Sequence, residues 1–167
     1  GLISISVTDA FFLGMVIKLD NVFDARYFIP ITGMLMGNTL RTVIIALDGY
    51  FAKIDKDENI YRWYLANGAS QREAVHPFVR DALKLAFNPT IASTAVMGLI
   101  SLPGMMTGQI LGGSDPSVAV KYQIMLIITI FSSGIMNVVL TIVFSNRFAF
   151  DSFGNLKKVI FRKTNSV

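Results

Sequence analysis

The chain has 167 residues, of which 53% are hydrophobic and only 16% are charged. Soluble domains carry about 25% charged residues, so this composition excludes a disordered chain, a coiled coil and an ordinary water-soluble enzyme core. The lack of cysteine excludes disulfides, thiolate metal sites and cysteine nucleophiles, and the single histidine, His76, excludes multi-histidine metal centres. The composition is typical of a protein that lies in a lipid bilayer.

Long charge-free runs predict membrane-spanning helices. Residues 85–114 and 122–146 contain no Asp, Glu, Lys or Arg, and each is longer than the ~20 residues that cross a bilayer. Residues 28–47 are equally apolar except for Arg41, and residues 2–17 form a weaker run. Because unpaired backbone groups are very costly in hydrocarbon, each span should be helical.

These runs predict an all-α fold, a polytopic transmembrane helical bundle with about four spans. The bundle should form a single domain over residues 1–167, with spans at about residues 2–18, 28–52, 78–102 and 117–146. We expect the first span to be the truncated end of a longer helix.

The basic residues predict the orientation. They gather between the second and third spans and after the last span: Lys53, Lys56, Arg62, Arg72, Arg80, Lys84, Arg147, Lys157, Lys158, Arg162 and Lys163. By the positive-inside rule, the loop at 53–77 and the C-terminal tail at 147–167 face the cytoplasm of a multi-pass inner-membrane protein, and residues 103–116 face outward. The net charge of +4 is therefore a topology signal and does not indicate a nucleic-acid partner.

The cytoplasmic loop has the signals of a folded helix-turn-helix. Asp57 suits a helix N-cap, Gly68 suits the left-handed residue after a helix, and Ser70 with Glu73 forms a capping-box pattern that starts a second helix. Pro77 should kink that second helix. Two interpretations remain open, an aromatic-rich interfacial anchor or a docking element that transmits force from a soluble partner.

Proline and glycine should break the third span twice, at Asn88-Pro89 and over residues 101–108. Irregular backbone at membrane depth is tolerated where it is buried in protein or lines a wet cavity, and such broken helices mark solute pathways in transporters. Ser101, Thr107 and Gln109 supply polar groups there. The alternatives are a pathway lining or a plain outer turn with a re-entrant hairpin that only packs.

Isolated polar residues permit several interpretations. Arg41 and Asp48 lie seven residues apart on one helical face, and Arg41 is expected to reach toward the headgroups. Lys121 could pair with Asp115, cap that end of the last span, or attract an anion. Four methionines could be soft metal ligands, although packing is the commoner role of methionine: Met34, Met36, Met105 and Met106.

Three motifs carry a family resemblance. They are residues 27–34 followed by Gly37-Asn38, then Leu65 with residues 68–74, and finally residues 98–108 continuing through Asp115-Pro116 to residues 119–125. The motifs resemble the signatures of FetB-type ABC-transporter permeases, a family that includes the plant aluminium-sensitivity permeases. The resemblance covers residues 27–146. Family members are longer, with further helices before the region of Leu2, and Arg41 stands where a small or apolar residue is expected.

The resemblance implies a permease subunit that works by alternating access, with a second permease copy and a separate ABC-type ATPase that binds ATP–Mg. This chain would bind no cofactor and would not be an enzyme, and no phosphate-binding G-x-x-x-x-G-K-[ST] loop occurs in it. Iron export or metal tolerance is implied, with a sugar nucleotide as the substrate proposed for plant relatives. The expected ATPase-coupling residues are Leu65, Gly68, Ala69, Ser70 and Glu73. The expected pathway residues are Asn38, Ser101, Pro103, Gly104, Met105, Met106, Thr107, Gln109, Asp115 and Lys121.

Other functional classes predict different behaviour. A channel would use the hairpin between Pro103 and Gly113 as a pore loop and would conduct without nucleotide. An intramembrane enzyme would need a nucleophile–base pair or a metal cluster inside the bilayer, for which the sequence offers little. A purely structural membrane subunit would leave the proline and glycine breaks without a role.

Overall fold

The computed structural model of the chain describes residues 25–97, 103–151 and 154–156, with side chains from residue 32 onward. Within these ranges the fold is all-α, as predicted, and contains no strand. The helices are α2 (Ala25–Lys56), α3 (Glu58–Ala66), α4 (Gln71–Ala95), α5 (Gly104–Leu111) and α6 (Pro116–Ala149). The predicted first span at 2–18, Ser101 and the tail from residue 157 lie outside the described residues.

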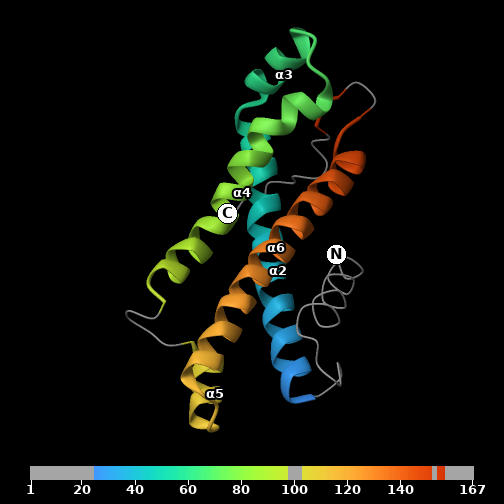
Figure 1. Ribbon diagram of the computed structural model, residues 1–167. Coiled ribbons are helices and arrows are strands. Elements are labelled where there is room, and N and C mark those ends of the chain that lie inside the picture. Colours follow the sequence, from blue (N-terminus) through green and yellow to red (C-terminus); the bar gives the residue numbers. More distant parts are fainter. Residues whose placement is uncertain (1–24, 98–102, 152–153, 157–167) are drawn as a thin grey trace, which may run out of the picture.

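Three long helices form the body of the bundle. Helix α2 packs against both α4 and α6, and Figure 1 shows α2 and α6 running in the same direction with α4 running in the opposite one. The 32 residues of α2 and the 34 residues of α6 extend about 48 Å and 51 Å at ~1.5 Å per residue. Both lengths exceed the ~30 Å hydrocarbon layer, so these helices are long enough to project beyond it.

The helix α4 is continuous where the sequence predicted a first break. It runs through both Pro77 and Pro89, so the predicted interruption at Asn88-Pro89 is wrong. Ala82, Ala86 and Phe87 are buried on this part of α4, and this packing holds the helix together despite the hydrogen bond that a proline removes.

The second predicted break is present, although it comes earlier than expected. The helix α4 ends at Ala95, and α5 begins at Gly104 with Pro103 at its N-cap position. The expected outer loop at 103–116 is therefore mostly helical, and α5 lies beside the first turns of α6 (Figure 1). Gly113, with φ of +91°, lies in the turn that joins them.

Among the described helices, α6 alone is long and apolar enough to cross a membrane by length and composition, with a mean hydropathy of 2.2 over its best window. Large apolar side chains project outward from several helices. They include Leu40, Ile44, Leu85, Ile91, Leu111, Ile124, Ile128, Val143, Phe144 and Phe148. Such faces suit contact with lipid or with further apolar protein.

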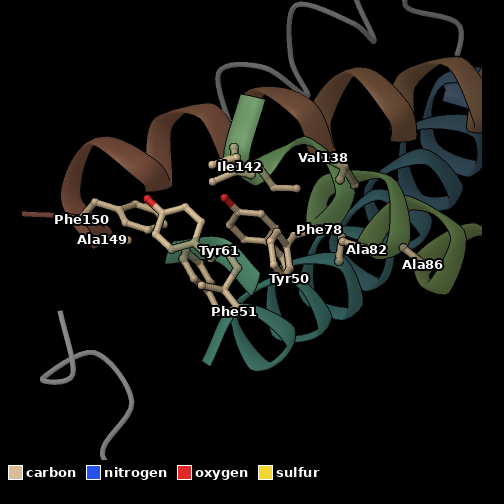
Figure 2. Packing of buried hydrophobic residues seen from close by; sticks show 14 of the residues in the cluster. Tyr50, Phe51, Tyr61, Phe78, Ala82, Ala86, Val138, Ile142, Ala149 and Phe150 are labelled. Atoms are coloured by element: carbon tan, nitrogen blue, oxygen red, sulfur yellow. The ribbon is translucent and has the colours of Figure 1, made fainter. Parts of the chain in front are cut away.

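The hydrophobic core lies in the half of the bundle where α2 meets α3 and where α6 ends. Figure 2 shows Tyr50, Tyr61, Phe78 and Phe150 converging with the smaller Ala82 in this cluster. The rings of Tyr61 and Phe78 meet edge to face with centroids 6.4 Å apart. We call this part of the molecule the coupling half, after the role that the sequence predicts for its loop, and the part that contains α5 and the start of α6 the outer half, after its predicted orientation.

Candidate functional site

The turn between α3 and α4 has the geometry that its sequence predicts. Gly68 has φ of +87°, which a residue with a side chain rarely adopts, and no neighbouring atom lies close to it. Its N–H donates to the Leu65 carbonyl at 3.0 Å, and the Ala69 N–H donates to the Tyr64 carbonyl at 3.1 Å. These bonds close the end of α3, so the turn is a defined structure that projects from the end of the bundle.

The predicted capping box starts α4. The Ser70 hydroxyl accepts from the Glu73 N–H at 3.4 Å, and the Glu73 carboxylate accepts from the Ser70 N–H at 2.7 Å. The hydrogen bonds from Ser70 hold the pKa of Glu73 below its ordinary value. The two reciprocal hydrogen bonds connect the turn to the first residues of α4.

Helix α3 is tied to the chain that follows α6. The Tyr61 hydroxyl donates to the Gly154 carbonyl at 2.9 Å, and its ring lies 5.6 Å from that of Phe150 between centroids. Burial raises the pKa of Tyr61, so the hydroxyl keeps the proton that it donates. The sequence predicts only a basic tail after residue 146 and carries no local signal for this contact.

Two further links join the long helices just beneath the turn. The Tyr50 hydroxyl of α2 donates to Asn146 Oδ1 of α6 at 2.9 Å, and Lys53 of α2 forms an ion pair with Asp81 of α4. The ion pair is partly exposed, so it adds little stability and serves mainly to fix position. Helix α3 itself packs against α4 and α2 and reaches the chain after α6 through Tyr61, and the two links join α2 to α6 and to α4.

The aromatic residues of α3 leave both sequence interpretations of the loop open. Trp63 is 61% exposed, whereas Tyr61 is 2% exposed and belongs to the core. Asp57 takes the predicted N-cap position of α3, but its side chain makes no capping hydrogen bond. The exposed Trp63 is available to a membrane surface or to a docked protein.

A cavity of about 200 Å³ lies at the second break, between the end of α4, the start of α5 and α6. Pro103 and Met106, both predicted pathway residues, line it. Thr94, Met97 and Gln123 also line it, and the site prediction missed these three. We call it the outer cavity because it lies in the outer half. Two thioethers, one hydroxyl and one amide lie in its otherwise apolar wall.

Gln123 is the polar centre of this cavity. Its side chain is 8% exposed, its Nε2 lies 3.6 Å from the Met97 sulfur, and its Oε1 has no hydrogen-bond partner. An unpaired buried carbonyl oxygen costs about 1–3 kcal/mol. A solute or water that donates a hydrogen bond, or a cation, would recover that cost.

Buried polar groups continue along α6 from Gln123. Thr129, Ser133 and Asn137 recur at every fourth position and are each no more than 5% exposed. The Asn137 amide donates to the Ser133 carbonyl at 2.9 Å, which leaves the Asn137 Oδ1 buried without a partner. These residues give α6 a polar stripe inside an apolar bundle, and the regular spacing was the signal that could have revealed it.

The other predicted pathway residues that the structure describes do not line the cavity. Asp115 caps α6 by accepting from the Ser117 N–H at 2.8 Å, and Lys121 is exposed and forms no ion pair with it. The Asn38 amide donates within α2 to the Met34 carbonyl at 2.8 Å. Of the α5 residues, Gly104 is exposed and the others are half-buried: Met105, Thr107 and Gln109. Metal binding by the methionines stays a hypothesis.

The family and three relatives were identified by comparison. The family described as "Uncharacterised protein family (UPF0014)" matches residues 2–150. The "UPF0014 membrane protein YjkA" of Bacillus subtilis is 34% identical, over 70% of this chain and 46% of the relative. The "Probable iron export permease protein FetB" of Escherichia coli is 34% identical, over 67% of this chain and 43% of the relative. "Protein ALUMINUM SENSITIVE 3" of Arabidopsis thaliana is 40% identical, over 61% of this chain and 37% of the relative.

No solved structure matches the chain. The matched part of this chain spans about half or less of the length of these relatives, between 37% and 46%. Since the family match nevertheless extends over residues 2–150 and the relatives are named as membrane or permease proteins, the chain belongs to the UPF0014 family of membrane proteins.

Proposed function

We propose that this chain carries the coupling element and the broken helix of an ABC-transporter permease, and that a separate ATPase drives it. The observation that carries the proposal is the hydrogen-bonded turn at Gly68, which follows α3 at one end of the bundle. Helix α3 packs against α2 and α4, and its Tyr61 bonds to Gly154 in the chain that follows α6. A displacement of such a turn is passed on to the helices behind it, since packed interiors shift as units and do not deform locally.

The charge distribution supports an orientation with the turn in the cytoplasm. Basic side chains at the coupling end include Lys53, Lys56, Arg62, Arg72 and Arg147, whereas the described side chains of the outer end include only Lys121 among Lys and Arg. This asymmetry is what the positive-inside rule associates with the cytoplasmic side of an inner-membrane protein. The C-terminus would then be cytoplasmic as well.

The outer cavity and the polar stripe of α6 support a solute pathway. The unpaired oxygens of Gln123 and Asn137 could coordinate a cation, or they could accept hydrogen bonds from the water of a hydrated ion. The FetB relative is named for iron export, and we propose metal export as the function of the complete permease, formed by two copies with two ATPase subunits. The ATP–Mg would be bound by those ATPase subunits.

The test replaces Gly68 in the complete permease, reconstituted with its ABC-type ATPase in vesicles. Gly68→Val strains the left-handed backbone by about 1–2 kcal/mol, whereas Gly68→Asn is a matched control because asparagine tolerates this conformation. Both side chains would enter open space. We expect the rate of transport-coupled ATP hydrolysis to fall roughly tenfold in the valine variant. The asparagine variant should hydrolyse ATP at close to the wild-type rate.

A second readout locates the turn. Ala69→Cys, in a cysteine-free background of the complete permease, introduces a thiol at the turn that a membrane-impermeant maleimide can label from one side only. Labelling should require inside-out vesicles and should be blocked by the bound ATPase. Labelling from the outside, or equal hydrolysis in both Gly68 variants, would contradict the proposal, and conductance without nucleotide would favour a channel.

A further inference from the structure

A second cavity, a groove of about 580 Å³, lies between the start of α4 and the end of α6, next to the turn that joins α3 to α4. Its wall has a basic and polar part and an apolar part. Arg72 and His76 of α4 and Arg147 of α6 are basic or polar, whereas Val139 and Val143 of α6 are apolar. The groove is separate from the outer cavity, and the coupling mechanism described above does not use it.

The two helices arrange these side chains in the same order of depth. On α6, Val139, Val143 and Arg147 follow one another at intervals of four and therefore share one face. On α4, Arg72 comes at the start of the helix, and the apolar Val79 comes two turns further in. Because α4 and α6 run in opposite directions, both arginines lie at the coupling end and the valines lie deeper.

In the part of the chain that the structure describes, no acidic side chain neutralises the charge of the groove. Among the described residues, no carboxylate lines it and neither Arg72 nor Arg147 forms an ion pair. The carboxylate of the adjacent Glu73 is already engaged by Ser70. By contrast, Arg62 at the same end of the molecule contacts Glu58 at 2.6 Å.

We propose that this groove binds an anionic phospholipid, with the phosphate between Arg72 and Arg147 and an acyl chain along the valines. Guanidinium groups bind phosphate oxygens in a bidentate manner, and Arg147 directly follows the uncharged run 122–146, where a spanning helix is expected to reach the headgroups. An apolar protein helix in this groove would leave two arginines unpaired. A free phosphate ion would leave the valine-lined floor unused.

A lipid in this position would brace α4 against α6 directly behind the turn. It would couple the membrane composition to the stability of the coupling half. The inference depends on the membrane embedding of the chain but not on ATP-driven transport, so its test needs no ATPase. Failure here would leave the proposed transport function untouched.

The test uses the complete protein purified in a mild non-ionic detergent. Dioleoyl phosphatidylglycerol, dioleoyl phosphatidylcholine and inorganic phosphate are titrated separately, and the melting temperature and native mass spectra report binding. We expect only phosphatidylglycerol to raise the melting temperature. The double variant Arg72→Gln with Arg147→Gln should weaken its apparent affinity by about 100-fold, since each charged hydrogen bond contributes roughly tenfold or more.

The matched control is Lys56→Gln with Arg62→Gln, which removes the same charge from the coupling end outside the groove. Its affinity for phosphatidylglycerol should stay within about twofold of wild type, apart from the weak effect of general surface charge. An equal loss in the control pair, or an equal response to inorganic phosphate, would overturn the proposal. So would a photo-crosslinker on Val143→Cys that reacts with another protein segment instead of lipid.

Discussion

The coupling half of the bundle is packed with aromatic and small apolar side chains, whereas the outer half and the middle of the bundle bury hydroxyl and amide groups. Tyr50, Phe78 and Ala82 are each no more than 3% exposed in the coupling half. In the other region Gln123 and Thr129 are buried at comparable depth. The difference fits two separate roles. Close apolar packing in the coupling half transmits displacement, whereas the buried polar groups elsewhere offer binding sites at a cost in stability.

The largest expected effect tests the packing of the coupling half. Phe78→Ala removes a ring that contacts Tyr61 and is 3% exposed. Truncating a buried phenylalanine typically costs about 3–5 kcal/mol of unfolding free energy. Denaturant unfolding in detergent should show this loss, and a cost below ~1 kcal/mol would mean that the coupling half is loosely packed.

A smaller effect compares two glycines. A Cβ at Gly134 of α6 would lie 3.0 Å from the Phe87 ring, whereas a Cβ at Gly37 of α2 would meet nothing within 4 Å. Gly134→Ala should therefore cost ~1–3 kcal/mol by overpacking, and Gly37→Ala should gain up to ~1 kcal/mol from helix propensity. The same unfolding measurement checks both, and similar changes in the two variants would show that Gly134 is not closely packed against Phe87.

The smallest effect on stability concerns the outer cavity. Gln123→Leu removes the unpaired Oε1 and the weak contact to Met97, so the unfolding free energy should change by less than ~1 kcal/mol or rise. Solute-stimulated ATP hydrolysis should nevertheless fall if this amide lines the pathway. Met106→Leu, in the same cavity, serves as a control for shape. A variant that loses stability like Phe78→Ala would show that Gln123 is structural.

Features that depend on neighbouring residues could be predicted from the sequence. The left-handed Gly68 and the capping box of Ser70 and Glu73 involve groups within a few positions of one another, so the residue types alone indicate the geometry. The same holds for the apolar helix α6 and for the interruption before Gly104.

Features that depend on contacts between residues far apart in the sequence could not be predicted from it. Pro89 looked like a break because the packing of α4 on α2 has no local sequence signal. Gln123 lies six residues before the regularly spaced polar residues of α6, and only the facing helices determine that it is buried. The family motif predicts Asp115 and Lys121 as pathway residues. In the structure Asp115 caps α6 and Lys121 is exposed.

The contact between α3 and the residues after α6 also determines how the protein can be labelled. Phe150 and Gly154 cover the ring and hydroxyl of Tyr61. A fluorescent reporter or affinity tag fused directly after Ala149 would displace these residues and leave a buried tyrosine facing water. Fusions therefore belong beyond Leu156, which packs against the same cluster.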